Sequence, residues 1–172
     1  MLVVTKPRFE ELVDTHQGEL FAYLWRMLGD EDDARDCLQD TFLRALRAYE
    51  RIEDFSYLRA WLYKIATNAA RSQLSKNGRR QRRGVKLTPQ VASGERAVDV
   101  QVSERLNHAE VRQAVLALPP RQRAALMMRK YQELEYAEIA AALDCTEEAA
   151  RANVYQALKS LRSKFKDVED EE

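Results

Sequence analysis

Apolar side chains that recur at steps of three and four residues constrain this chain more than any other feature. Before Gly29 they form a single stripe, the pattern of an amphipathic helix. The stripe consists of Phe9, Leu12, Val13, His16, Leu20, Phe21, Leu24 and Leu28. Similar patterns predict helices over 7–28, 31–49, 57–76, 104–117, 120–131, 136–143 and 147–166. Because regular alternation is hard to find and the chain has only 5 Gly and 4 Pro, we predict an all-α fold.

Residues that start and stop helices stand at the expected boundaries. Gly29 is predicted to end the first helix and Asp30 to cap the second. Ser56 and Thr146 are predicted caps of the third and the last helix, and Pro120 suits a helix start, where a missing N–H costs little. The expected buried face of the second helix comprises Ala34, Leu38, Phe42, Ala45 and Leu46.

The composition changes after the third predicted helix. Residues 76–86 are basic, contain two glycines and lack an apolar period. We therefore interpret 77–102 as a basic, flexible linker between two small helical domains. The domains are expected at 1–76 and 103–166, followed by an acidic tail at 167–172.

The charges are balanced overall but distributed unevenly. The 28 basic and 28 acidic side chains give a net charge of zero, which taken alone argues against a nucleic-acid partner. Residues 1–86 carry 16 basic and 13 acidic side chains, whereas five of the remaining acids lie in the tail 167–172. Both halves can therefore present basic faces, although the acidic tail brings the net charge of the whole chain to zero. The basic run at 79–83 is either a solubilising loop or a phosphate contact.

Metal, disulfide and catalytic chemistry find no support in the sequence. Cys37 and Cys145 form no CxxC pair and have no nearby histidine, so both are interpreted as buried small apolar residues. There is no Gly-rich phosphate loop, HExxH or GxSxG motif. We expect no cofactor and no enzymatic activity. Without a leader, or an apolar run near the roughly 20 residues that span a bilayer, we expect a cytoplasmic protein.

Residues 136–155 have the pattern of a helix-turn-helix. Small and apolar residues recur in both predicted helices, and a tight turn separates them. The second helix would then fit the major groove of DNA. Its outward side carries Arg151, Ala152, Tyr155, Gln156 and Lys159. Many helical hairpins imitate this spacing, so a purely structural hairpin remains an alternative for this segment alone.

Three segments in register resemble the extracytoplasmic-function (ECF) group of the sigma-70 family. Residues 33–45, D-A-R-D-C-L-Q-D-T-F-L-R-A, resemble the polymerase-binding helix of sigma region two. Residues 61–68, W-L-Y-K-I-A-T-N, resemble that group's W-L-Y-[RK]-I-A-x-N segment. L-P-P-R-Q-R at 118–123 and Y-A-E-I-A at 136–140 resemble the opening of region four. The resemblance implies a sigma factor whose two helical domains bind core RNA polymerase and promoter DNA.

The same resemblance implies three sites. A polar strip on the second helix would dock on the coiled coil of the largest polymerase subunit through Arg35, Asp36, Gln39, Asp40 and Arg44. The loop 52–57 and one face of the third helix would engage the minus-ten element through Tyr63, Lys64, Asn68 and Arg71. The last helix would read the minus-thirty-five element through Arg151, Ala152, Asn153, Tyr155, Gln156 and Lys159.

The sequence departs from the family pattern at three positions. Asp144 stands where the turn usually has Gly, and Asn153 and Gln156 stand where Arg is common. Asp tolerates left-handed backbone, so the turn is expected to survive, but fewer cations make the minus-thirty-five contact weaker or differently specific. The resemblance further implies an anti-sigma partner. We also expect the acidic tail 167–172 to shield the basic faces of the free protein.

Three other classes of protein compete with this interpretation. A helix-turn-helix regulator that is not a polymerase subunit explains 103–166 but leaves 33–44 and 61–68 without a role. An enzyme lacks a recognisable base or metal-ligand pattern. An adaptor that binds polymerase but reads no promoter is the third, and transcription from a promoter distinguishes it.

Overall fold

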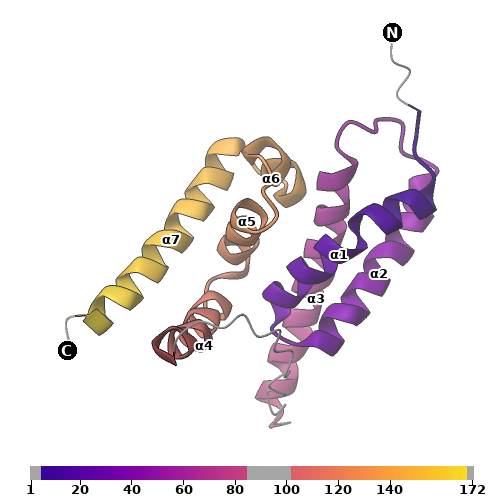
Figure 1. Ribbon diagram of the computed structural model, residues 1–172. Helices are drawn as coiled ribbons and strands as arrows, with labels where there is room; N and C mark the ends of the chain where they lie inside the picture. Colours follow the sequence, from indigo (N-terminus) through magenta and orange to yellow (C-terminus); the bar gives the residue numbers. More distant parts are fainter. Residues whose placement is uncertain (1–4, 85–101, 170–172) are drawn as a thin grey trace.

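The computed structural model describes residues 5–84 and 102–169, and within these ranges the chain forms seven α-helices and no strand (Figure 1). The helices are α1 (Phe9–Leu28), α2 (Glu31–Tyr49), α3 (Leu58–Arg82), α4 (Val102–Leu116), α5 (Pro120–Lys130), α6 (Tyr136–Leu143) and α7 (Glu147–Glu169). The predicted all-α fold is confirmed. In the described ranges, no helix is both long and apolar enough to cross a membrane.

Helix α3 continues past its predicted end, through Gly78. The side chain of Asn77 ties the added turn to α2, because its Nδ2 donates to Oδ2 of Asp33 at 3.0 Å. The basic side chains of the last turn also suit the negative end of the helix dipole. The predicted linker therefore begins as helix. Its residues 85–101, like residues 170–172 of the acidic tail, lie outside the described ranges.

Four of the five predicted helix boundaries are confirmed, including Pro120, which is the first residue of α5. Gly29 ends α1 with φ 72°, a left-handed conformation that favours glycine, and an added Cβ would lie 2.9 Å from the end of the Leu116 side chain of α4, which would have to shift. Asp30 caps α2 by accepting from the Asp33 N–H at 2.8 Å, and Thr146 accepts from the N–H of Ala149 at 3.1 Å. The Ser56 prediction was wrong, since α3 starts after Tyr57 without a side-chain cap.

The seven helices form two units that pack against each other. Helices α1, α2 and α3 form one bundle, and α4 to α7 form the second, with α5 and α6 on the side that faces α1 and α3 (Figure 1). The second unit contacts the first mainly where α6 meets α3 and α5 meets α1. The two units are therefore closed onto each other in this structure.

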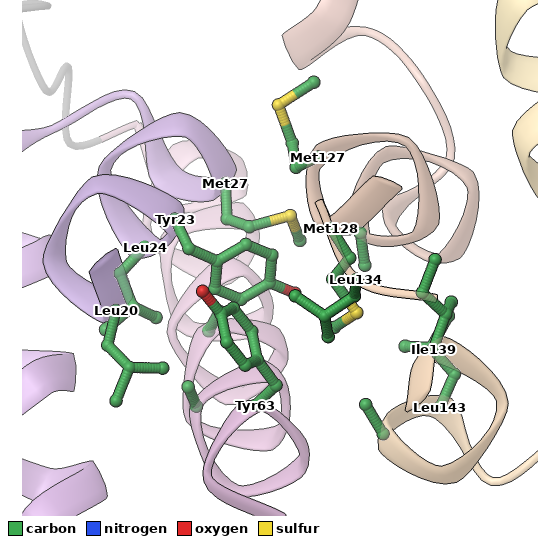
Figure 2. Close-up of a cluster of buried hydrophobic side chains, with 14 of the residues drawn as sticks. Leu20, Tyr23, Leu24, Met27, Tyr63, Met127, Met128, Leu134, Ile139 and Leu143 are labelled. Carbon is green, nitrogen blue, oxygen red and sulfur yellow. The ribbon is translucent and has the colours of Figure 1, made fainter. Parts of the chain in front are cut away.

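A continuous hydrophobic core joins the two units. From the first unit, Tyr23 and Tyr63 meet edge to face with ring centroids 5.1 Å apart. Met128 and Leu134 enter the same buried cluster from the second unit (Figure 2). All four side chains are fully buried. Full burial of one large apolar side chain stabilises the folded state by roughly 1.5 to 3 kcal/mol. The shared core therefore stabilises the contact between the two units.

Candidate polymerase and nucleic-acid interfaces

The outward side of α2 carries all five side chains predicted to dock on the polymerase. The helix buries Ala34, Cys37, Thr41 and Ala45, which turns Arg35, Asp36, Gln39, Asp40 and Arg44 away from the core. Arg35 pairs with Glu31, and Arg44 Nη2 lies 2.9 Å from Asp40 Oδ2. Exposed pairs of this kind contribute little stability, so these groups remain available to a partner.

Two leucines add apolar surface to this side of α2. Leu46 was predicted to be buried, and that prediction was wrong, because its side chain is 51% exposed. Leu43 is 48% exposed. Leu43 lies four residues and Leu46 seven residues after Gln39, so both lie on the same helical face as Gln39. Counting helical positions from Gln39 in the sequence would have predicted this mixed polar and apolar surface.

The two cysteines have no partner for a disulfide or metal. Cys37 is buried, as predicted, and burial together with the neighbouring carboxylates of α2 raises the pKa of its thiol to about 11. Cys145 is only half-buried, in the turn after α6. Among the described residues, no cluster of His, Cys, Asp and Glu could hold a metal ion.

The predicted minus-ten residues divide between core and surface. Tyr63 was predicted to lie on a polar face that meets DNA, and the structure contradicts that placement, since its side chain is fully buried. It packs on Tyr23, because α3 is covered by α1 on this side. Asn68 and Arg71 are exposed on α3, and Lys64 is partly exposed. In the preceding loop, Tyr57 is 56% exposed.

A carboxylate network that sequence reasoning missed holds Tyr63 in place. Glu19 of α1 accepts hydrogen bonds from the Tyr63 hydroxyl at 2.9 Å and from Arg59 Nη2 at 2.7 Å, and His16 Nδ1 lies 2.5 Å from it. Burial would raise the pKa of Glu19, but these bonds outweigh it and lower the pKa to about 2. Arg59 Nη2 also donates to the carbonyl of Gln132 at 2.6 Å, which ties the network to the second unit.

The turn of the helix-turn-helix lies against the exposed part of α3. Asp144 Oδ1 accepts a hydrogen bond from Lys64 Nζ at 2.9 Å. Asn68, Arg71 and Arg121 join Asp144 in lining a cavity of about 190 Å³ between the units. The pair Lys64–Asp144 is separated by 80 positions in the sequence, and no sequence signal connected them.

The predicted helix-turn-helix is present as α6, a turn and α7. Asp144 ends α6 in the left-handed conformation, with φ 50° and ψ 54°, as its tolerance of that region predicted. Ile139 and Leu143 of α6 and Ala150 and Val154 of α7 are buried. The opposite side of α7 is therefore free to face a partner.

The predicted minus-thirty-five residues lie mostly on that free side. Arg151, Ala152, Tyr155, Gln156 and Lys159 are exposed, and the Tyr155 side chain is 61% exposed. The Arg151 guanidinium stacks 4.3 Å from the ring centroid of Tyr136. Asn153 differs from this group, because it is half-buried and its Nδ2 donates to the carbonyl of Ala149 at 2.9 Å. Its amide is thus occupied within the helix.

Comparison with known proteins identifies the family. The models of Sigma-70 region 2 and of Sigma-70, region 4 match residues 12–80 and 108–161. The RNA polymerase sigma-H factor of Pseudomonas aeruginosa is 30% identical over 165 residues, which cover 91% of this chain and 85% of that protein. The ECF RNA polymerase sigma factor SigW of Bacillus subtilis is 27% identical, with 93% and 90% covered. The chain belongs to the ECF group of the sigma-70 family.

Some relatives of this sigma factor are longer. The ECF factor SigG of Mycobacterium tuberculosis is 34% identical over 90% of this chain, which spans only 48% of SigG. Among solved structures, the sigma factor RpoE in complex with the anti-sigma factor NepR from Bartonella quintana has a TM-score of 0.74 at 24% identity, covering 92% of this sigma factor and 96% of RpoE. CnrH in complex with the cytosolic domain of CnrY has a TM-score of 0.65 at 23% identity, covering 92% and 88%. These likenesses support the same two-unit fold.

Proposed function

We propose that this sigma factor binds core RNA polymerase and directs promoter-specific initiation of transcription. The observation that carries the proposal is the presence of both sigma regions on one chain, in family order, at 12–80 and 108–161. The exposed side of α2, with its mixed charges and two leucines, is the surface proposed for polymerase. Apolar side chains beside polar ones are a common composition for a protein interface.

The promoter contacts follow from the chemistry of the exposed side chains. On α3, Lys64 and Arg71 would hold phosphates, and the amide of Asn68 would bond the edge of an unstacked minus-ten base. On α7, Gln156 would bond adenine, and Arg151 would contact guanine or phosphate. Tyr155 offers an exposed ring for packing against bases. Tyr63 is assigned a supporting role instead, because its hydroxyl is bonded to Glu19.

Control by an anti-sigma protein is also part of the proposal. The solved structures of RpoE with NepR and of CnrH with the CnrY cytosolic domain support it by analogy of fold. A partner that covers α2 would compete directly with polymerase for Asp36, Gln39 and Asp40.

The test is transcription from a fragmented library of host DNA by core polymerase supplied with the purified chain. We expect discrete new start sites that are lost in Asp40→Ala and in Asn68→Ala but retained in Asp14→Ala, a matched change at an exposed carboxylate of α1. Polymerase binding without initiation would point to an adaptor. Absence of polymerase binding, together with specific binding to a duplex operator, would instead favour a helix-turn-helix regulator.

A further inference from the structure

The segment before α1 lies against the loop that joins α2 to α3, at one end of the first bundle (Figure 1). Lys6 Nζ donates to the carbonyl of Tyr49, the last residue of α2, at 2.5 Å, and to the carbonyl of Ile52 in the loop at 3.2 Å. The same ammonium lies 4.5 Å from the ring centroid of Tyr49 and 5.6 Å from that of Phe55. Lys6 therefore contacts the loop at two points, Ile52 and Phe55.

The end of α2 is a favourable place for the Lys6 ammonium. The last carbonyls of a helix lack partners within the helix and carry the negative end of its dipole. A lysine has three donors and no acceptor, so one ammonium can bond two carbonyls at once. Its positive charge is also attracted to the faces of nearby aromatic rings. Because the Lys6 side chain is half-buried, solvent screens these attractions less than at an open surface.

Tyr49 fixes the same segment independently of the loop. Its hydroxyl donates to the carbonyl of Pro7 at 2.5 Å. Its buried ring meets Phe9 of α1 with ring centroids 5.3 Å apart. The segment that carries Lys6 is therefore held by α1 and α2, and it gives the loop a fixed support.

The loop itself has few internal restraints. The Ile52 N–H bonds the carbonyl of Tyr49 at 3.1 Å, and the Ser56 N–H bonds Oδ1 of Asp54 at 2.9 Å. Within the described part of the chain, residues 53–55 make no hydrogen bond between backbone groups. The conformation of the loop therefore depends on side-chain contacts, and Lys6 supplies two of them.

The loop carries an aromatic ring at the surface expected to meet the minus-ten element. Tyr57 is 56% exposed, and the carboxylates of Glu53 and Asp54 are exposed beside it. Carboxylates repel phosphates, so this loop suits an unstacked base better than the DNA backbone. An exposed aromatic ring can stack on a base of any identity. The position of the ring depends on the conformation of the loop before it.

We propose that Lys6 is a positioning residue for the minus-ten contact, holding the loop 52–57 in the conformation that receives one unstacked base. The proposal rests on the proposed function, because it takes this loop as part of the minus-ten surface. Lys6 acts through the loop, since its ammonium is occupied by the carbonyls of Tyr49 and Ile52. Its loss should therefore affect one position of the promoter rather than the whole contact.

Amide hydrogen exchange of the full-length chain, followed by NMR, tests whether Lys6 orders the loop. Lys6→Met keeps an unbranched apolar side chain and removes the ammonium. We expect the Ile52 amide to exchange about three- to tenfold faster in Lys6→Met than in the wild-type chain. Arg8→Met removes an exposed cation of the same segment and should exchange like the wild-type chain. Equal rates in all three proteins would overturn the proposal.

Binding of a minus-ten single strand by the holoenzyme tests the contact itself. The strand comes from a promoter recovered by the transcription experiment and carries an abasic site at each position in turn. At the position of the captured base, the abasic site should weaken binding about three- to tenfold less in Lys6→Met than in the wild-type holoenzyme. At the other positions the losses should be equal. A general folding defect would instead give additive losses at every position, and that result would overturn the proposal.

Tyr49→Phe gives an independent check, because it removes the bond to the Pro7 carbonyl and keeps the buried ring. It should show a smaller loss confined to the same promoter position, which excludes a defect peculiar to Lys6→Met. Initiation by the wild-type holoenzyme tests the sigma role alone. If the wild-type holoenzyme initiates while Lys6→Met gives additive losses at every position, the positioning role fails and the sigma role stands.

Discussion

The Tyr63 hydroxyl of α3 donates a hydrogen bond of 2.9 Å to Oε2 of Glu19 on α1. The same carboxylate accepts from Arg59, whose guanidinium reaches the Gln132 carbonyl of the second unit. One half-buried acid therefore links α1, α3 and the α5–α6 loop. This relationship makes the fold of this sigma factor sensitive to a single ionisation.

Glu19→Gln should lower the free energy of unfolding by about 2 kcal/mol at pH 7. The pKa of Glu19 is lowered from 4.5 to about 2 in the folded chain. Its stabilising contribution is therefore complete above pH 4.5 and is lost as the pH falls toward 2. Urea unfolding of both proteins at several pH values checks this, and a difference that does not shrink below pH 4.5 would contradict it.

Tyr63→Phe should lower the free energy of unfolding by about 1.5 to 3 kcal/mol, because it removes one hydrogen bond to a carboxylate while keeping the buried ring. Promoter selection should be unchanged, since the hydroxyl faces the core. Asn68→Ala is the matched comparison on the exposed side of α3, and it should reduce initiation without a comparable loss of stability. Melting curves and run-off transcription separate the two, and equal losses of initiation would return Tyr63 to the DNA contact.

Arg123→Met should cost about 2 to 3 kcal/mol of stability. The buried guanidinium donates to the carbonyls of Met27, Leu116 and Leu118, and burial lowers its pKa. Methionine fills similar volume but leaves these carbonyls without their donor. Arg162→Met on the exposed side of α7 is the control and should stay within about 0.5 kcal/mol of wild type. Similar unfolding midpoints for the two variants would disprove the stabilising role of the Arg123 hydrogen bonds, one of which joins α5 to Met27 of α1.

Leu46→Ala should weaken polymerase binding by about 1 to 2 kcal/mol while leaving stability within about 0.5 kcal/mol. The side chain is half exposed on the face that carries Gln39, so its apolar surface is available to a partner rather than to the core. Titration with labelled core polymerase measures the affinity. A loss of stability with unchanged affinity would assign Leu46 to the fold instead.

Gln156→Ala and Lys159→Ala should affect the minus-thirty-five contact in different ways. Loss of a bidentate amide should cost about 1 to 3 kcal/mol and relax base preference at one position. Loss of a phosphate-contacting cation should weaken binding to all sequences and reduce the salt slope by about 1. Promoter binding by the holoenzyme at several salt concentrations measures both, and identical profiles would contradict the division of roles.

The sequence alone determined the helices, most of their ends and the outward residues of α2 and α7. These features depend on interactions within a few residues: the apolar period, the left-handed Gly29, and the caps Asp30 and Thr146. The family motifs could be placed on them because each motif lies within one helix or one hairpin. The extension of α3 was missed, since it depends on Asn77 reaching Asp33 in another helix.

Only the tertiary structure decided which side of α3 is covered and what covers it. A helical period separates apolar from polar residues, but an amphipathic tyrosine such as Tyr63 suits either side until α1 and its Glu19 are placed. Lys64 and Asp144 lie 80 positions apart in the sequence and in different units. Their pairing therefore depends on how the two units dock. Such docking is determined by the shape and charge of both finished surfaces, which no local sequence pattern contains.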